Sequence, residues 1–126
     1  MTTTTTTLET MYADAFDHGE CISIYLGKNE RCIGVVDVGG RGNNRRVSSL
    51  TVDREFRCKG YATKLMNKVI ERHGKANLHL VAMPTPGKDN LSMPSLVRFY
   101  ERLGFSIVPD TLSRPPLSVR MKRPAK

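Results

Sequence analysis

The 126-residue sequence has few cysteines, no long apolar run and a shortage of acidic residues after residue 40. Its three cysteines, Cys21, Cys32 and Cys58, are odd in number and form no CxxC pair, which argues against a disulfide framework and a zinc site. No stretch approaches the roughly 18 apolar residues of a membrane-spanning helix. Residues 1–20 lack the basic start and apolar stretch of a signal peptide. We therefore expect a cytoplasmic protein with no metal and no membrane partner.

Acidic residues are outnumbered by basic ones, 12 to 20, and the imbalance is uneven along the chain. Residues 1–40 hold six acids and two bases (net −4), whereas residues 41–72 and 73–126 each hold nine bases and three acids (net +6). A positive field of this kind attracts polyanions: nucleic acid, a phosphorylated cofactor or an acidic protein face. Charge alone does not choose among these partners.

The length supports one domain over residues 1–126, and a chain of this size can bury a sufficient core. Threonines occupy residues 2–7, so we expect residues 1–8 to be disordered. Apolar spacing and strand-like alternation then predict helices over 8–16, 59–74 and 92–103, and strands over 21–26, 31–38, 46–52, 77–83, 105–108 and 117–121. This order predicts an α/β (α+β) fold, with a mixed, mostly antiparallel central sheet and flanking helices.

The segment from Val52 to Met66 carries the clearest chemical signal. A predicted strand ends there, a short basic loop with one glycine follows, and an amphipathic helix begins. The free N–H groups and the dipole of a helix start favour an anion, and Gly60 lets a ligand approach the main chain. Arg57 and Lys59 add positive charge. The segment therefore predicts a phosphate or pyrophosphate site, although it matches neither the P-loop nor the GxGxxG pattern.

This segment resembles the acetyl-CoA-binding motif of the GNAT superfamily of N-acyltransferases, V-x-P-x-x-[R/Q]-x-x-G-x-[G/A]. A second run, from Tyr100 to Phe105, resembles the family's Y-x-x-x-G-F signature. The first motif is matched at Val52, Arg57, Gly60, Ala62, Leu65 and Met66. The sequence departs from the family pattern at four positions: Arg54 replaces a common proline, Cys58 a common glycine, Met93 a common asparagine and Leu96 a common alanine.

The resemblance implies a GNAT-like fold and an acetyl-CoA-dependent N-acetyltransferase that uses acetyl-CoA as co-substrate. It implies direct attack by a primary amine in a ternary complex, with no covalent enzyme intermediate. Tyr100 would be the general acid that protonates the leaving thiolate, a role that suits a phenol protonated at neutral pH. The cofactor would be held by two segments: the strand end Leu50, Thr51 and Val52 for the pantetheine arm, and the main chain of Arg57, Cys58, Lys59, Gly60, Tyr61 and Ala62 for the pyrophosphate.

No residue stands out as the general base. The candidates are Asp37, Asp53, Glu55 and His79, and a structural role is favoured for His79 because Leu78 and Leu80 point to the other side of its strand. Structural roles compete for the other residues too. Arg57 and Gly60 could belong to an ordinary strand–helix turn, and Tyr100 could be a core residue.

Two other functions stay open at this point. A small basic nucleic-acid-binding module fits the charge, but only Phe56 and Tyr61 are interleaved with its basic residues, whereas such modules usually stack bases on several aromatics. A non-catalytic CoA-binding protein fits the absence of a clear base. The family usually places a strand and two helices before its hairpin, and only about 20 residues precede Cys21 here. The acceptor pocket is therefore expected to be open or completed by a partner subunit in a homodimer.

Overall fold

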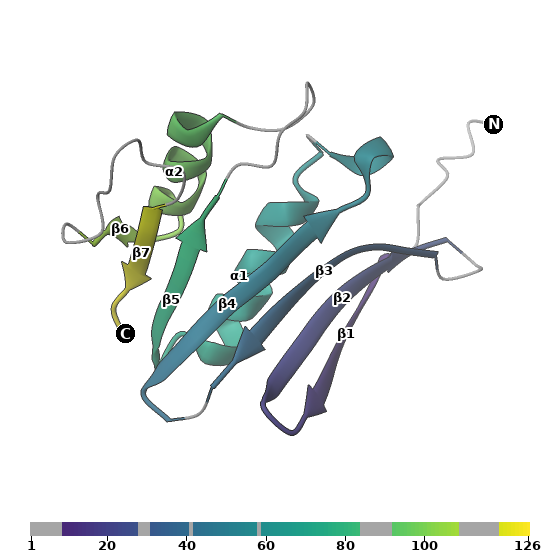
Figure 1. The fold of residues 1–126 in the computed structure, drawn as a ribbon. Helices are drawn as coiled ribbons and strands as arrows, with labels where there is room; N and C mark the ends of the chain where they lie inside the picture. Colours follow the sequence, from purple (N-terminus) through teal and green to yellow (C-terminus); the bar gives the residue numbers. More distant parts are fainter. Residues whose placement is uncertain (1–8, 28–30, 41, 58, 84–91, 109–118) are drawn as a thin grey trace.

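The computed structural model describes residues 9–27, 31–40, 42–57, 59–83, 92–108 and 119–126 (Figure 1). Predictions for residues 1–8, for Cys58 and for the proline-containing loops lie outside these residues. The elements, in chain order, are β1 (Glu9–Phe16), β2 (Gly19–Leu26), β3 (Arg31–Gly39), β4 (Asn44–Val52), the 3-10 helix η1 (Arg54–Phe56), α1 (Tyr61–His73), β5 (Asn77–Ala82), α2 (Met93–Glu101), β6 (Ser106–Ile107) and β7 (Val119–Arg123).

The strands form one seven-stranded sheet with the order β1-β2-β3-β4-β5-β7-β6. All neighbouring strands are antiparallel except β4 and β5, which are parallel. The β4–β5 pairing covers only Asn44–Arg46 and Asn77–His79, and beyond it the two strands diverge toward their carboxyl ends (Figure 1). The expected mixed, mostly antiparallel sheet with flanking helices is confirmed.

The core lies between the helices and one face of the sheet. Buried and exposed residues alternate along β5, where Leu78, Leu80 and Ala82 are buried and Val81 is exposed, as expected for a sheet covered on one side. α1 packs on β2, β3 and β4, whereas α2 packs on β5. Both helices contribute to a single hydrophobic cluster with the buried strand residues.

The prediction of a helix over residues 8–16 is wrong, because residues 9–16 form strand β1. Met11, Tyr12 and Phe16 have helical spacing, but Glu9–Phe16 pairs residue for residue with Gly19–Leu26. A short helix is marginal by itself, whereas β2 offers a template of strand hydrogen bonds through a two-residue turn. Tertiary pairing thus overrides a weak local preference. The other predicted elements are confirmed with small shifts of boundary; the last strand ends two residues later than predicted.

Helix α1 follows its predicted amphipathic pattern, with Leu65, Met66 and Val69 buried. Gly74 caps its carboxyl end in a right-handed conformation (φ −67°) that other residues also adopt. The need for glycine is one of space, since a Cβ at residue 74 would lie 2.4 Å from the carbonyl oxygen of Ile70.

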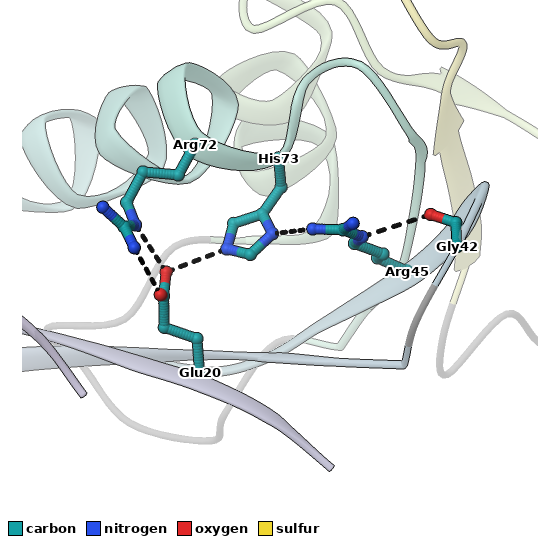
Figure 2. A network of polar contacts seen from close by, with 5 residues as sticks. All are labelled: Glu20, Gly42, Arg45, Arg72 and His73. Atoms are coloured by element: carbon teal, nitrogen blue, oxygen red, sulfur yellow. Dashed lines mark hydrogen bonds and ion pairs between the residues drawn. The ribbon is translucent and has the colours of Figure 1, made fainter. Parts of the chain in front are cut away.

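A network of polar side chains fastens the carboxyl end of α1 to the sheet (Figure 2). The buried Glu20 carboxylate accepts two hydrogen bonds of 2.6 Å from Arg72 and one of 2.9 Å from Nε2 of His73. Nδ1 of His73 lies 2.6 Å from Arg45 Nη1, and Arg45 also donates to the carbonyl of Gly42. Because arginine only donates, Nδ1 accepts, and His73 is the neutral tautomer with its proton on Nε2. Arg72 holds the pKa of Glu20 at about 2, well below its usual 4.5.

Candidate functional site

The carboxyl end of β4 presents main-chain groups where β4 has already diverged from β5. On one side, Thr51 and Val52 pair with Val35 and Gly34 of β3. On the other side, no described strand pairs with β4 beyond Arg46. The N–H and C=O groups along that second side can therefore bind an extended ligand in the manner of an added strand.

A β-bulge lies just before this strand end. Val35 pairs with Thr51 and Asp37 with Ser48, so that Ser49 and Leu50 oppose the single residue Val36. Ser49 has φ 55°, the one positive φ found among the described non-glycine residues. The bulge turns the following main-chain groups of β4, and a strained residue of this kind is often found next to a functional site. Neither Ser49 nor the bulge was predicted, because nothing in the pattern of residues 46–52 distinguishes a bulged strand from a regular one.

The turn between β4 and α1 leaves the start of the helix open. Gly60 is the N-cap, with φ 85°, and no side chain caps the helix there. A Cβ built on Gly60 meets nothing within 4 Å among the described residues. The N–H groups of the first turn have no partner within a helix, and together with the helix dipole they favour an anion. Gly60 thus supplies the room for close approach expected of it, and it also adopts a left-handed conformation that glycine tolerates best.

Basic and aromatic side chains surround this helix start. The Arg57 guanidinium turns back, and its Nε donates to the Val52 carbonyl at 3.0 Å. Arg31 and Lys59 lie over the Phe56 ring at 5.3 and 5.7 Å from its centroid, and Phe56 contacts Tyr61 edge to face. The positive charge expected for a phosphate site is therefore present, although Arg57 also braces the turn itself.

Tyr100 lies in the last turn of α2, packed edge to face against Phe99 and Phe105. Its side chain is buried, and this burial raises the pKa of the phenol above its usual value of 10. Tyr100 therefore carries its proton at neutral pH. It belongs to the same hydrophobic cluster as Val52. Among the described residues, its hydroxyl makes no hydrogen bond to residues 50–62, and its ring contacts are with Phe99 and Phe105.

The four predicted general-base candidates do not lie together: Asp53 and Glu55 belong to the turn after β4, whereas Asp37 and His79 lie elsewhere in the sheet. Asp53 and Glu55 are exposed and paired with Arg31, at 3.4 and 3.2 Å. His79 lies beside Arg46, at the opposite end of β4 from Val52, and its Nε2 is 3.0 Å from Oδ1 of Asn44.

Asp37 lies on β3 opposite Cys21 of β2. Burial, followed by the hydrogen bond with Asp37, raises the pKa of the Cys21 thiol to about 11. The described residues also contain no cluster of three or more His, Cys, Asp or Glu side chains suited to a metal ion. They include no helix long and apolar enough to span a membrane.

A diverging parallel strand pair with an uncapped helix start beside it is an arrangement that can bind a phosphate-bearing, extended ligand. The model of the acetyltransferase (GNAT) family matches residues 2–105. The chain belongs to this family, and it is an acetyl-CoA-dependent acetyltransferase. No curated protein matches the sequence.

Solved structures show the same fold at low sequence identity. The ribosomal-protein-S18-alanine N-acetyltransferase of Escherichia coli is 15% identical, with a TM-score of 0.69 over 94% of this chain and 95% of that one. Nourseothricin acetyltransferase is 20% identical, with a TM-score of 0.63 over 95% and 85% of the two chains. A streptothricin acetyltransferase candidate of Bacillus anthracis, solved with acetyl-CoA, is 17% identical, with a TM-score of 0.63 over 88% and 65%.

Proposed function

We propose that this protein transfers the acetyl group of acetyl-CoA to a primary amine by direct attack in a ternary complex. The observation that carries the proposal is the open start of α1 beside the part of β4 that no described strand pairs with on its β5 side. The main chain of residues 57–62 binds the pyrophosphate, and Leu50, Thr51 and Val52 bind the pantetheine arm. The raised pKa of Tyr100 supports its role as the acid that protonates the leaving CoA thiolate.

The acceptor side supports an amine carried on a large molecule. β1 joins β2 through the two residues between Phe16 and Gly19, so no helix is inserted between these strands. A protein lysine or a protein N-terminus is therefore favoured as the nucleophile over a small-molecule amine. Because the Asp53 and Glu55 carboxylates are engaged by Arg31, we propose that water or the main chain relays the proton from the amine. We also propose a cytoplasmic location, in line with the isolated cysteines.

The first test is thermal unfolding of the full chain with acetyl-CoA, CoA, ATP or a short DNA duplex, at two salt concentrations. A ligand that binds only the folded state raises the unfolding midpoint. The proposal expects a larger rise with acetyl-CoA and CoA than with ATP, and little dependence on salt. No response to either CoA species, with a salt-sensitive response to DNA, would favour the nucleic-acid-binding alternative.

The second test measures turnover. Release of the free CoA thiol is followed with amine acceptors of three kinds: a lysine-containing peptide, a peptide with a free N-terminus and a small polyamine. Amine-dependent release supports acetyl transfer. Tight binding of acetyl-CoA without release on any acceptor would support the non-catalytic alternative.

A further inference from the structure

The face of the sheet that α1 and α2 leave uncovered carries a row of basic residues. Arg46 of β4 is paired with His79 of β5, and His79 is paired with Lys122 of β7. On β5, Leu78 and Leu80 are buried on the helix side, so His79 between them points to the uncovered face. Residues paired across strands point to the same side of a sheet. Arg46, His79 and Lys122 therefore form one row across three strands, about 10 Å long, which we call the basic row.

The cations of the basic row are accessible and have no acidic partner among the described residues. Arg46 is exposed and Lys122 is half-buried, and neither forms an ion pair within the described part of the chain. Arg120 points the same way two residues before Lys122 on β7, and it is exposed too. Nε2 of His79 lies 3.0 Å from Oδ1 of Asn44, which is an amide and carries no charge. The positive charge of the row is therefore left for a partner.

The acidic residue beside the basic row does not offset this charge. Asp37 of β3 is a diagonal neighbour of Arg46 across the sheet, since Asp37 pairs with Ser48. Among the described residues, Asp37 forms no ion pair with Arg46, and it shares a hydrogen bond with the Cys21 thiol. Charges of one sign gathered on one surface attract a partner of the opposite sign. An anionic group placed over the basic row would interact with several cations at once.

The rest of the uncovered face favours an acidic protein segment over a nucleic acid. Asp14 of β1 is paired with Cys21 of β2, and Cys21 with Asp37 of β3, so the same face is acidic toward β1. A nucleic acid carries a phosphate on every nucleotide and would be repelled there. Proteins that bind single strands also stack bases on aromatic side chains, and the basic row has no phenylalanine, tyrosine or tryptophan. A protein segment can place its carboxylates over the basic row alone.

We propose that the basic row is a docking site for an acidic segment of a partner protein, whose carboxylates pair with Arg46 and Lys122. Alternate residues of an extended segment lie about 7 Å apart on one side, so acidic residues two apart reach both long side chains. The proposal is independent of the acetyl-transfer function. Arg46 and Val52 are at opposite ends of β4, about 20 Å apart along the strand, so the docking site is separate from the candidate acetyl-CoA site.

The first experiment titrates the full chain into a fluorescently labelled, glutamate-rich peptide at low salt, from about 1 µM to about 1 mM protein. We expect saturable binding that weakens as salt is added, because salt screens exposed charges. The same peptide with glutamine in place of each glutamate should not bind. No saturable binding of the glutamate peptide, or equal binding of both peptides, would overturn the proposal.

Paired variants test whether the peptide binds at the basic row. Arg46→Gln combined with Lys122→Gln should weaken binding of the glutamate peptide about 10-fold, since each exposed ion pair contributes modestly. Arg98→Gln combined with Arg102→Gln is the matched control, because it removes the same charge from exposed positions of α2 and its cap, on the other side of the sheet. The control should weaken binding by less than about 2-fold. Cooperative unfolding would show that both variants are folded, and an equal loss in the two would overturn the proposal.

A single-stranded oligonucleotide of the same charge as the glutamate peptide tests the class of partner. We expect weaker binding of the oligonucleotide, because Asp14 and Asp37 repel the phosphates that extend beyond the basic row. If the oligonucleotide bound more tightly than the peptide, and lost affinity in the variant with Arg46→Gln and Lys122→Gln, the partner would be a nucleic acid and the proposal would be wrong.

Discussion

The two ends of α1 differ in how their polar groups are used. At the amino end, Gly60 leaves the first-turn N–H groups without a side-chain cap, next to a strand edge without a described partner. At the carboxyl end, Arg72 and His73 bind Glu20, and Gly74 closes the helix. One helix is thus anchored at one end and left open for a ligand at the other. The free N–H groups at the amino end are tolerated because a bound anion can accept their hydrogen bonds. The contacts of Arg72 and His73 at the carboxyl end stabilise the helix instead.

The largest effect on acetyl-CoA binding is expected from Gly60→Glu, which places a side chain at the open amino end of α1. The new side chain would occupy the anion position, its carboxylate would repel the pyrophosphate, and residue 60 would keep an unfavourable positive φ. We expect acetyl-CoA to lose its effect on the unfolding midpoint, and acetyl transfer to fall below detection. Gly42→Glu is the matched control, because Gly42 also has a positive φ and open space around it. An equal loss in both variants would mean that strain, and not the site, explains the result.

The next largest effect is expected from Tyr100→Phe. Removal of a general acid typically costs 10²- to 10⁴-fold in rate, so kcat should fall by about that factor with little change in KM. Burial raises the pKa of Tyr100, so wild-type activity should persist at neutral pH and decline only as the pH rises through that raised value. The variant should lose this alkaline decline. A pH–rate profile measured on both proteins checks the prediction, and an unchanged kcat would assign Tyr100 to the core alone.

At the anchored end, Glu20→Gln should reduce stability by about 2 kcal/mol at pH 7. A pKa held at about 2 instead of 4.5 corresponds to about 3 kcal/mol, and we discount this value because Arg72 is 45% exposed. The stabilisation is present above about pH 4.5 and is lost as the pH falls toward 2. The stability difference between the two proteins, measured by urea unfolding, should therefore shrink over that range. A difference that stays constant with pH would contradict the assignment.

The smallest effect is expected from Lys64→Gln, near the open end. Lys64 pairs with Glu9 at 2.6 Å, but both side chains are partly exposed, at 46% and 34%. Exposed ion pairs contribute at most about 1 kcal/mol, and salt screens them. We expect Lys64→Gln to lose less than half as much stability as Glu20→Gln. At high salt, this loss of stability should be smaller still. If Lys64→Gln lost as much stability in urea unfolding as Glu20→Gln, the two ends of α1 would be anchored equally.

Several features of the site could be predicted from local sequence. The spacing of Leu65, Met66 and Val69 predicts α1, because a helix buries one face every 3.6 residues. The single glycine before that helix predicts an open turn, and Gly60 has the left-handed φ that a side chain would resist. Resemblance to a family motif then indicates acetyl-CoA. These inferences depend on residues close together in the chain, where backbone geometry limits the outcomes.

Other features depend on residues far apart in the chain. Glu20, Arg45 and Arg72 meet only because the sheet places β2 and β4 beneath the end of α1. Likewise, the divergence of β4 from β5 and the bulge at Ser49 arise from pairing with neighbouring strands. The predicted helix over residues 8–16 shows most clearly what local sequence cannot predict. The apolar residues there have helical spacing, but residues 9–16 form a strand that makes eight residue pairs with β2.

The sequence by itself determined the mixed sheet, helix α1 with its open glycine start, and the motif that places the chain among acetyltransferases. Only the tertiary structure decided that β1 is a strand, that no described strand pairs with its outer edge, and that two general-base candidates pair with Arg31 while the other two lie elsewhere. The physical reason is the range of the interactions. Helical periodicity and turn conformation act over a few residues, whereas strand pairing and buried ion pairs join residues that only the completed fold brings together.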